Sequence, residues 1–239
     1  MPSANKSADF SDIWPIADTI PGWLTMAQAG LLHEQARALH RGELAVEIGS
    51  HQGRSTVVLA HALRSRGSRL VAVDPFVDGR LFGGSPTKSK FETNVRAAGV
   101  QADVELREAY STKLRPLWQE QLGMLYIDGK HDYWTVSDDL RWTRHVRPEG
   151  VVLIHDAFSS IGVTLGLLHH VLLGSTLAYE LREGSLALFR RRPPALRDRL
   201  RLLAQLPWWI SNVVIKVLLR LRLRPVARLL GHDSPYDPY

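Results

Sequence analysis

The sequence predicts one α/β domain with a doubly wound, seven-stranded and mostly parallel sheet that ends in an antiparallel hairpin. Three observations favour this fold. Short apolar runs alternate with stretches of helical periodicity, and a glycine-containing turn follows the first run. Two strand-like runs joined by four turn residues then close the series, a pattern typical of a hairpin. The chain of 239 residues is long enough for one such domain and an appendage.

The individual elements follow the same alternation. Thr25 comes after the breaker pair Pro21-Gly22 and is predicted to cap the first helix. We expect an N-terminal segment at residues 1–24, without the apolar run of a signal peptide, and a domain at residues 25–192. The predicted strands are residues 44–48, 70–73, 103–106, 124–127, 151–154, 177–181 and 186–190, and the predicted helices are residues 25–39, 53–62, 88–98, 133–145 and 163–173.

Composition excludes several kinds of site. The chain has no cysteine, which excludes disulfides, thiolate nucleophiles and cysteine-based metal sites and fits a cytoplasmic location. The net charge of +6 is not spread evenly, because residues 190–230 hold ten Arg and one Lys against one Asp. The rest of the chain is therefore about four charges negative, and we expect no nucleic-acid partner for the domain.

A turn motif at residues 47–56 follows the first predicted strand. Gly49 permits a sharp turn, and Gly53 lets the backbone approach a ligand at a helix N-terminus. The G-x-x-x-G spacing matches neither a dinucleotide fingerprint nor a P-loop. Asp74 ends the next strand, where a carboxylate can bind both hydroxyls of a ribose. Glu47 would repel a pyrophosphate but suits the cationic portion of S-adenosylmethionine; the alternative is a turn whose glycines serve packing alone.

Residues 47–56 resemble the first motif of class I methyltransferases. The core from about residue 20 to residue 190 is similar to the group that includes macrocin-type and other sugar O-methyltransferases of actinobacteria. Residues 20–24 and 47–56 also resemble mycobacterial methyltransferases that act on methylmannose polysaccharide. The resemblance implies the seven-stranded methyltransferase sheet and S-adenosylmethionine as cofactor. It implies a cofactor site that includes Ser50, Ser55, Ser111 and Asp128.

Acids and histidines follow two predicted strands whose carboxyl ends lie at the same edge of the sheet. Asp128 and His131 come after one strand, and His155 and Asp156 after the next. A divalent metal could lower the pKa of an acceptor hydroxyl there, and a histidine could remove its proton. The resemblance implies Asp128 and Asp156 as metal ligands and His131 as general base. His155, where many relatives carry a second acid, is a further predicted ligand; Mg²⁺ is the expected ion, and a histidine ligand would admit Mn²⁺.

Each of these groups has a structural alternative. Asp128 could cap a turn, His131 could be a solvated loop residue, and His155 could be a packed histidine satisfied by backbone. The long loop at residues 76–89 is a candidate lid over the substrate or a simple connector. Three further acids are expected to be exposed charges near a helix N-terminus: Asp132, Asp138 and Asp139.

The tail at residues 193–230 is predicted to be basic, amphipathic and helical. Asn212, Lys216 and Arg220 lie four apart on one face of an otherwise apolar segment. The apolar segment at residues 210–223 is too short and too charged to span a bilayer, whereas the pair Trp208-Trp209 and the arginines suit the interface of an anionic membrane. The alternative is packing on its own domain or on a homodimer partner. Residues 231–239 are expected to be disordered.

Together these patterns predict a metal-assisted, S-adenosylmethionine-dependent O-methyltransferase. Its acceptor would be a hydroxyl of a sugar, polysaccharide or glycolipid, at the inner face of the cell membrane. One alternative is a metal-independent methyltransferase for a small lipid-like or phenolic acceptor. A second is a membrane-associated module that binds the cofactor without catalysis.

Overall fold

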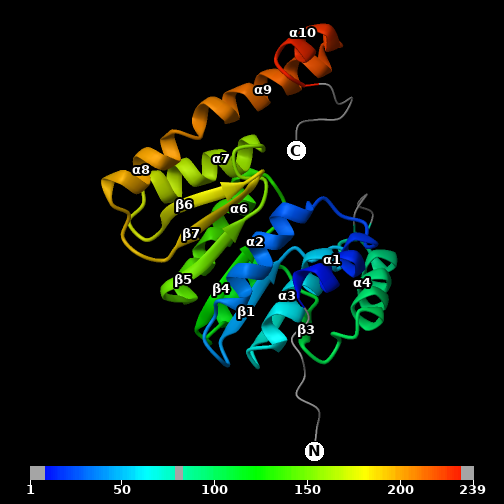
Figure 1. Cartoon of the computed structure of the whole chain (residues 1–239). Coiled ribbons are helices and arrows are strands. Elements are labelled where there is room, and N and C mark those ends of the chain that lie inside the picture. The colour runs from blue at the N-terminus through cyan, green and yellow to red at the C-terminus, as the bar shows by residue number, and fades with distance from the viewer. Residues whose placement is uncertain (1–8, 79–82, 233–239) are drawn as a thin grey trace, which may run out of the picture.

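The computed structural model describes residues 9–78 and 83–232. It contains one seven-stranded sheet with the order β3-β2-β1-β4-β5-β7-β6, in which helices cover both faces (Figure 1). The predicted fold is confirmed. The strands are β1 (Leu44–Ile48), β2 (Arg69–Val73), β3 (Val104–Arg107), β4 (Leu122–Ile127), β5 (Val146–Ile154), β6 (Ala178–Glu183) and β7 (Leu186–Arg190).

The register of the parallel strands determines where the loops meet. β1 pairs in parallel with β2 on one side and with β4 on the other, and β4 pairs in parallel with β5. The last residues of these four strands are aligned, with Ile48 opposite both Val73 and Ile127, and Ile127 opposite Ile154. The loops that follow all four strands therefore begin side by side at one edge of the sheet. The strand order reverses between β1 and β4, where open α/β sheets bind ligands.

Alternate residues of β1 enter two separate apolar layers. Ala45 belongs to the layer that includes the helices on one face, whereas Leu44, Val46 and Ile48 belong to the layer on the other. All five residues of β1 are buried, as expected for a central parallel strand covered on both faces. Helices α1 (Phe10–Asp18), α2 (Met26–Arg37), α3 (Arg54–Arg64) and α4 (Ser85–Ala97) contribute to the first layer, and α6 (Tyr133–Asp139) and α7 (Ile161–Leu167) to the second.

Several element boundaries differ from the prediction. Helix α1 was not predicted, yet its Ile13 and Ala17 are fully buried in the first layer. The predicted cap at Thr25 is confirmed, since its Oγ1 accepts a hydrogen bond from the Gln28 amide at 3.3 Å. The two long helices predicted after β4 and β5 each change winding, because short non-α turns follow α6 and α7. These and the remaining short elements are α5 (Ser111–Leu114), the 3₁₀ turns η1 (Arg115–Leu117) and η2 (Leu140–His145), and the π turn η3 (Leu168–Leu172).

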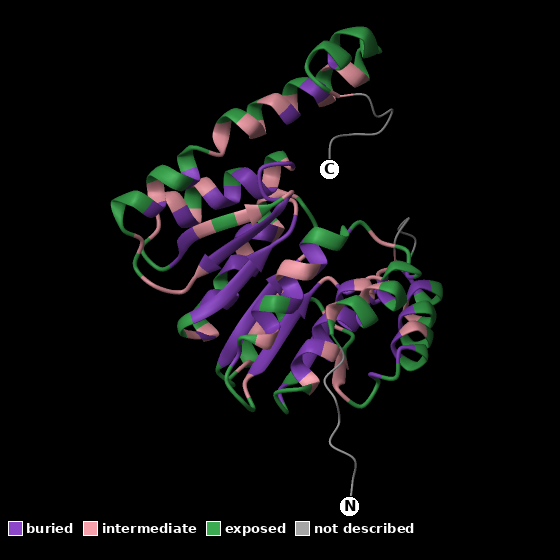
Figure 2. Ribbon diagram, viewed as in Figure 1, coloured by how far each residue is buried: buried purple, intermediate pink, exposed green. Residues whose placement is uncertain are grey.

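The tail forms three helices, α8 (Leu196–Leu203), α9 (Leu206–Arg220) and α10 (Arg224–Leu229), which we call the C-terminal arm. The arm runs along the domain and then beyond it, and far less of it is buried than of the sheet (Figure 2). Because α8 and α9 follow each other almost without interruption, residues 196–220 are long and apolar enough, by length and composition, to cross a membrane. Only 17% of the most apolar window is buried within the molecule.

Candidate functional site

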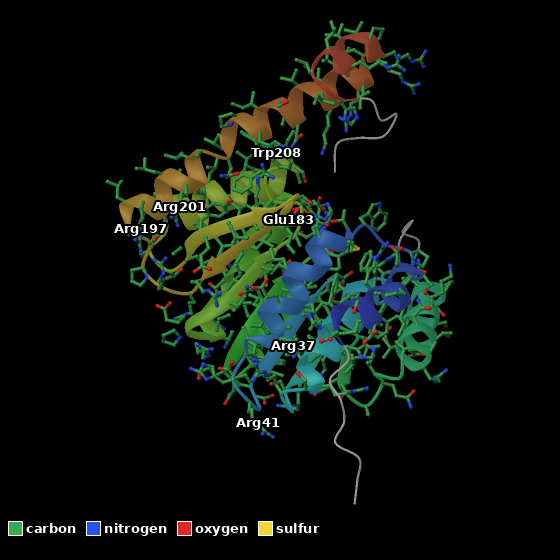
Figure 3. All side chains as sticks on the ribbon, in the orientation of Figure 1. Arg37, Arg41, Glu183, Arg197, Arg201 and Trp208 are labelled. Carbon is green, nitrogen blue, oxygen red and sulfur yellow. The ribbon has the colours of Figure 1, made fainter. Side chains whose placement is uncertain are left out.

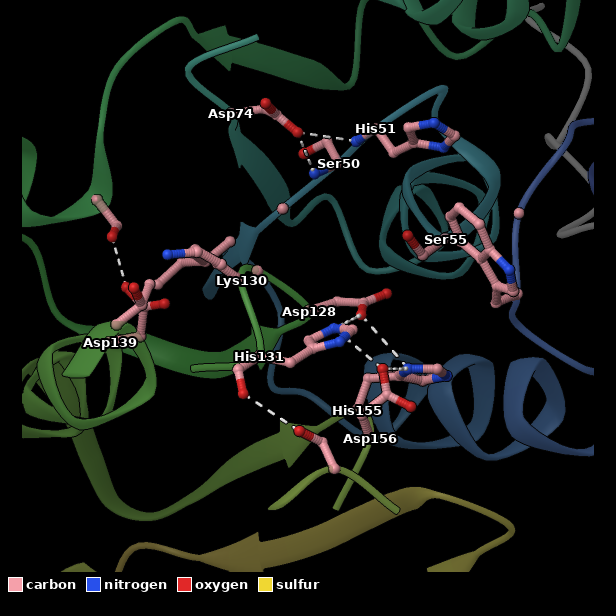
Figure 4. Close-up of a pocket in the computed structure, with 18 of the residues that line it drawn as sticks. Ser50, His51, Ser55, Asp74, Asp128, Lys130, His131, Asp139, His155 and Asp156 are labelled. Carbon is pink, nitrogen blue, oxygen red and sulfur yellow. Dashed lines mark hydrogen bonds and ion pairs between the residues drawn. The ribbon is translucent and has the colours of Figure 1, made fainter. Parts of the chain in front are cut away.

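A cavity of about 1390 Å³ opens at the edge of the sheet where β1, β2, β4 and β5 end. Its walls come from the loops after those four strands and from the start of α5, and Figure 4 shows their polar side chains gathered around it. Residues 21–24 line it near α3, and Lys216 and Arg220 of the C-terminal arm also line it. Nine predicted site residues meet in this cavity: Gly49, Ser50, Ser55, Asp74, Ser111, Asp128, His131, His155 and Asp156.

The turn after β1 is shaped by close contact with the end of β4. Gly49 has a φ of +88°, and a Cβ there would lie only 2.2 Å from the carbonyl oxygen of Asp128. Gly53 has a φ of +92° as the N-cap of α3, and a Cβ there would lie 3.3 Å from the ring of Phe91. Both positions therefore favour glycine for steric reasons. Gly49 lines the cavity, but Gly53 is not among its lining residues.

Asp74 ties this turn to the end of β2. Its Oδ2 accepts hydrogen bonds from the backbone amides of Ser50 at 3.0 Å and His51 at 2.9 Å, and its Oδ1 accepts one from Phe76 at 2.8 Å. Because a carboxylate offers about four acceptor positions and the three amides use three of them, about one position remains for a ligand hydroxyl. Asp74 is thus both a fixed part of the loop and a lining residue of the cavity.

Glu47 lies in a different place from the one expected of a group that contacts the cofactor. It is fully buried beneath the cavity and is not among its lining residues. Ser55 and Thr56 each donate a hydroxyl hydrogen bond to its carboxylate at 2.5 Å. Burial raises the pKa of Glu47 to about 7, against the lowering effect of these hydrogen bonds. In this geometry Glu47 braces α3 against β1.

Asp139 is a cavity residue that was predicted to be an exposed charge, and that prediction is wrong. It is 1% exposed, and Ser111 donates a hydrogen bond to its Oδ1 at 2.5 Å. Burial raises the pKa of Asp139 to about 7. The reason is the side of α6 on which Asp139 lies, which it shares with the buried Val136. Asp132 caps that helix by accepting bonds from two backbone amides of its first turn, and Asp139 lies on its last turn.

Asp128, His155 and Asp156 form a group that could hold a metal ion. One ligand atom from each lies within 4.8 Å of the others. The Nδ1 atom of His155 is 3.3 Å from Asp128 Oδ1 and 3.4 Å from Asp156 Oδ2. Figure 4 shows the three side chains converging from the ends of β4 and β5. The sequence-predicted metal ligands are therefore brought together.

The environment of His155 is unusual for a core histidine. Its ring is buried, Nε2 lies 3.4 Å from the Gln28 side-chain oxygen, and Nδ1 has no partner of good hydrogen-bond geometry. The alternative of a histidine satisfied by backbone does not describe these contacts. When Nε2 donates to Gln28, the Nδ1 lone pair faces two carboxylates, an arrangement that a shared proton or a cation would stabilise. Burial lowers the pKa of His155, but the carboxylates of Asp128 and Asp156 outweigh it and raise the pKa.

Asp156 has a strained backbone conformation, and its carboxylate lies beside two histidines. Its φ of +53° is in the left-handed region, which non-glycine residues seldom adopt. Ser159 donates a hydrogen bond to its Oδ1 at 3.0 Å. Burial alone would raise the pKa of Asp156, but His131 and His155 hold it well below its usual range. Backbone strain of this kind persists where the surrounding structure fixes a functional group.

His131 reaches the same carboxylates from the rim. Its Nε2 is 3.0 Å from Asp156 Oδ2 and 4.0 Å from Asp128 Oδ1, and its side chain is 47% exposed. Burial lowers its pKa, but the two carboxylates outweigh this effect and raise the pKa to about 10. In this arrangement His131 carries a proton, and it could act as a base only when its carboxylate partners are engaged by another cation.

Sequence reasoning missed three contributors to this cluster. Tyr126 donates a hydrogen bond to Asp128 Oδ2 at 2.9 Å from inside the sheet. Gln28 reaches His155 from α2, more than one hundred residues earlier in the chain, and no sequence signal pointed to that contact. Lys216 lines the cavity from the opposite end of the chain. The four-residue spacing of Lys216 and Arg220 was noticed, but only as the polar stripe of an isolated helix.

A methyltransferase-domain family profile matches residues 46–157, the segment from β1 to just past Asp156. Among solved structures, the cofactor-bound protein Rv0187 from MTB has 18% identity and a TM-score of 0.57, covering 80% of this chain and 94% of its own. The methyltransferase PaMTH1 from Podospora anserina has 12% identity and a TM-score of 0.60, covering 77% and 87%.

The O-methyltransferase TomG from Streptomyces achromogenes has 18% identity and a TM-score of 0.54, covering 81% of this chain and 92% of its own. These likenesses show the methyltransferase fold, and with the profile they support a class I methyltransferase domain. Because the neighbours align over nearly their whole length, the unaligned part of this chain lies outside the shared fold.

Proposed function

We propose that this protein is an S-adenosylmethionine-dependent O-methyltransferase that methylates a hydroxyl beside a bound divalent cation. The observation that carries the proposal is the meeting of Asp128, His155 and Asp156 within 4.8 Å in the cavity of a methyltransferase fold. The profile match and the neighbours support the donor, since TomG is in complex with S-adenosylmethionine and PaMTH1 is bound to S-adenosylhomocysteine.

The loops after β1 and β2 fit the donor. The turn at Gly49 has no side chain to obstruct a ligand, and the carboxylate of Asp74 can accept a hydrogen bond from a ribose hydroxyl. Ser111 and Asp139 offer a buried polar pair farther along the same cavity. The volume of about 1390 Å³ exceeds the roughly 300–1,000 Å³ of an ordinary small-ligand site. A donor and an acceptor therefore have room side by side.

The donor set fits a hard or borderline divalent cation. Two carboxylates and one imidazole are ligands that Mn²⁺ accepts, and Mg²⁺ would be held mainly by the carboxylates and water. The unpartnered Nδ1 of His155, aimed at both carboxylates, is the feature that such an ion would satisfy. A cation held there would supply Lewis acidity, which lowers the pKa of an acceptor hydroxyl.

His131 is placed to take the hydroxyl proton. Its Nε2 lies at the rim of the carboxylate cluster and is partly exposed to the cavity. In the reaction the acceptor oxygen forms a bond to the methyl carbon as the bond from that carbon to sulfur breaks. The hydroxyl proton passes to His131, and S-adenosylhomocysteine leaves. Most of the remaining catalysis is alignment of the two substrates.

The acceptor class proposed is a sugar, polysaccharide or glycolipid, supported by the sequence resemblance and by the size of the cavity. The first test is calorimetric titration of S-adenosylmethionine, with Mg²⁺ or Mn²⁺ and then with chelator, followed by a screen of sugar acceptors. Micromolar binding and metal-dependent turnover are expected. Absence of donor binding in both conditions would refute the proposal.

Two competing functions give different results in the same test. A metal-independent enzyme for a small phenolic or lipid-like acceptor would keep full turnover in chelator. A module that only binds the donor would show no turnover with any acceptor, and His131→Ala would change nothing measurable.

A further inference from the structure

The C-terminal arm brings two cations into the wall of the cavity. Lys216 and Arg220 lie one helical turn apart on α9, and both are among the lining residues. They come from outside residues 46–157, the segment that the methyltransferase profile matches. They also follow the last strand, β7, and therefore lie outside the seven-stranded sheet.

The position of Lys216 is fixed by contacts with the loop after β5. Its Nζ donates a hydrogen bond to the Ser159 carbonyl at 2.8 Å, and Asn212, one turn earlier, donates to the Phe158 carbonyl at 3.2 Å. Asn212 is buried, so this face of α9 is seated on the domain. The hydroxyl of Ser159 in turn donates to Asp156. Lys216 thus lies at the end of the cavity that holds the carboxylate cluster, away from Asp74.

The charges of Lys216 and Arg220 are not compensated. In the part of the chain that the structure describes, no carboxylate lies within ion-pair distance of either side chain. Two other cations that line the cavity do have partners, since Arg54 pairs with Asp18 and Lys130 pairs with Asp132. The carbonyl contact uses one of the three N–H donors of Lys216. Two free positive charges at the wall of a cavity attract an anion.

We propose that Lys216 and Arg220 bind an anionic group of the acceptor, a phosphate or a carboxylate, while its hydroxyl meets the cluster at Asp156. The assignment rests on the proposed function and narrows its substrate class to acidic acceptors. A neutral sugar would leave both positive charges without an ion-pair partner.

The test uses inorganic phosphate as the probe, with the full chain in chelator so that no metal can bind it. Phosphate is titrated into the wild type, into Lys216→Gln/Arg220→Gln, and into Arg222→Gln/Arg224→Gln. The third protein is the matched control, since its two exposed arginines lie on the same arm but not among the lining residues. We expect millimolar binding to the wild type and the control, and about tenfold weaker binding to the first variant.

Equal phosphate affinity in all three proteins, or none in the wild type, would overturn the assignment. S-adenosylmethionine is titrated into the same samples and should bind all three alike. Loss of donor binding in every sample would refute the proposed function, whereas the phosphate difference between variants reports on the anion site alone. The two failures are thus distinguishable.

A separate observation concerns the opposite face of the same arm, which we call the outer face. Ten apolar side chains of the arm are between 38% and 86% exposed: Leu196, Leu200 and Leu203 on α8, Ile210, Val214, Val217 and Leu221 along α9, and Val226, Leu229 and Leu230 around α10. Single exposed apolar residues are ordinary, but so many at helical spacing on one arm mark an interaction surface.

The tryptophan pair turns the other way. Trp208 lies under the Arg182 guanidinium at 3.9 Å, between α9 and the domain (Figure 3), and Trp209 packs against the second apolar layer. The expected role of this pair as interfacial anchors therefore does not match the structure. The arm does pack on its own domain, but with its polar stripe and tryptophans, so the outer face is left uncovered by the described chain.

Charge identifies the occupant of the outer face. Exposed arginines accompany these apolar side chains, among them Arg197 and Arg201 on α8 (Figure 3). The acid of the arm, Asp198, is buried; it pairs with Arg192 at 2.7 Å and lies 3.8 Å from Arg197. A second copy of the chain would bring these arginines against one another, which is unfavourable. An anionic lipid surface would neutralise them while it covers the apolar side chains.

We further propose that the outer face lies on an anionic membrane, with the arm parallel to the bilayer. The contacts of Asn212 and Lys216 keep α9 on the domain, which is incompatible with a helix surrounded by lipid. Because the inner face of α9 lines the cavity, this placement puts the cavity about one helix diameter, roughly 10 Å, from the lipid surface.

Flotation of the full chain with phosphatidylcholine vesicles, with and without about one-third phosphatidylglycerol, tests this placement. We expect the wild type to float with the anionic vesicles and to be released by salt. Val214→Glu/Val217→Glu should stay in solution. The matched control is Ile16→Glu/Leu117→Glu, which adds the same charge at exposed apolar residues away from the arm and should float.

A wild type that floats with neither vesicle, or an outer-face variant that still floats, would overturn the membrane assignment. Light scattering on the same samples checks the remaining occupant. A wild-type dimer that Val214→Glu/Val217→Glu converts to monomer would assign the outer face to a second copy and would also overturn it. Donor binding is independent of both outcomes.

Discussion

The two halves of the cavity are built in different ways. Around the ends of β1 and β2, Asp74 is satisfied by three backbone amides, and Gly49 is required by a close backbone contact. Around the ends of β4 and β5, His155 has an unpartnered nitrogen and Asp156 has a strained backbone. The backbone fixes the first half without a ligand, whereas the second contains a buried His155 nitrogen that lacks a hydrogen-bond partner and that a cation could satisfy. A fixed half suits binding of a cofactor, and a half with an open ligand position suits the reaction and the choice of acceptor.

This contrast predicts that substitutions in one half of the cavity change turnover or donor affinity without changing the other. The largest expected effect is a loss of turnover from a substitution in the second half. Asp128→Asn removes one charge from the cluster of three ligand atoms and should lower turnover by at least about 1,000-fold. Donor affinity, measured by calorimetry, should change little. A parallel loss of donor affinity would show that the two halves are one unit, and retained turnover would refute the metal-assisted mechanism.

The buried acid beneath the first half should affect stability and not donor binding. The pKa of Glu47 is raised from 4.5 to about 7, so the folded state holds a proton that the unfolded state releases. Stability should therefore fall as pH rises from about 4.5 to 7 and then stay level. The pKa difference between the folded and unfolded states corresponds to about 3 kcal/mol of folding free energy. Glu47→Gln should therefore be more stable than the wild type by up to about 3 kcal/mol at pH 8.

Urea unfolding of Glu47→Gln and the wild type between pH 5 and 8 measures this difference, which should vanish toward the acid end. Calorimetry at pH 8 supplies the control, because Glu47 does not line the cavity and its loss should leave donor affinity unchanged within a few-fold. A large loss of donor affinity would restore the direct contact that the sequence suggested for Glu47.

In the first half, Asp74 should be the residue on which donor affinity depends. Asp74→Ala removes a carboxylate that both fixes the turn and faces the cavity. Loss of hydrogen bonds to a charged acceptor costs about 2 kcal/mol, so donor affinity should fall roughly 30-fold. Metal binding, followed by Mn²⁺ titration, should remain. Undiminished donor affinity in this variant would refute the ribose role of Asp74.

The sequence predicted that most of the first half and the candidate metal ligands would meet at one edge of the sheet, because their signals are local. Glycines, an acid at a strand end and a His-Asp pair lie next to the strands that position them, and parallel pairing aligns those strand ends. The errors arose where position depends on distant packing. Asp139 was expected to be exposed, but it lies on the side of α6 that packs against the rest of the domain. The stripe with Lys216 was read as the polar face of an isolated helix, but α9 packs on the loop after β5.

Gln28 is the clearest case of such a distant contribution, and it gives the smallest of the expected effects. Its side-chain oxygen lies 3.4 Å from His155 Nε2, long for a hydrogen bond, and its amide donates to Ser185 Oγ at 3.1 Å. Residues that orient a metal-binding histidine typically change metal affinity by 10–100-fold. Because the contact is long, Gln28→Ala should weaken Mn²⁺ binding by about tenfold or less, with donor affinity unchanged.

Thr25→Ala, which removes the hydroxyl cap of the same helix, controls for loss of helix stability. Equal loss of Mn²⁺ affinity in both variants would mean that α2 acts through packing alone. A loss confined to Gln28→Ala would show that the second half of the cavity extends to α2.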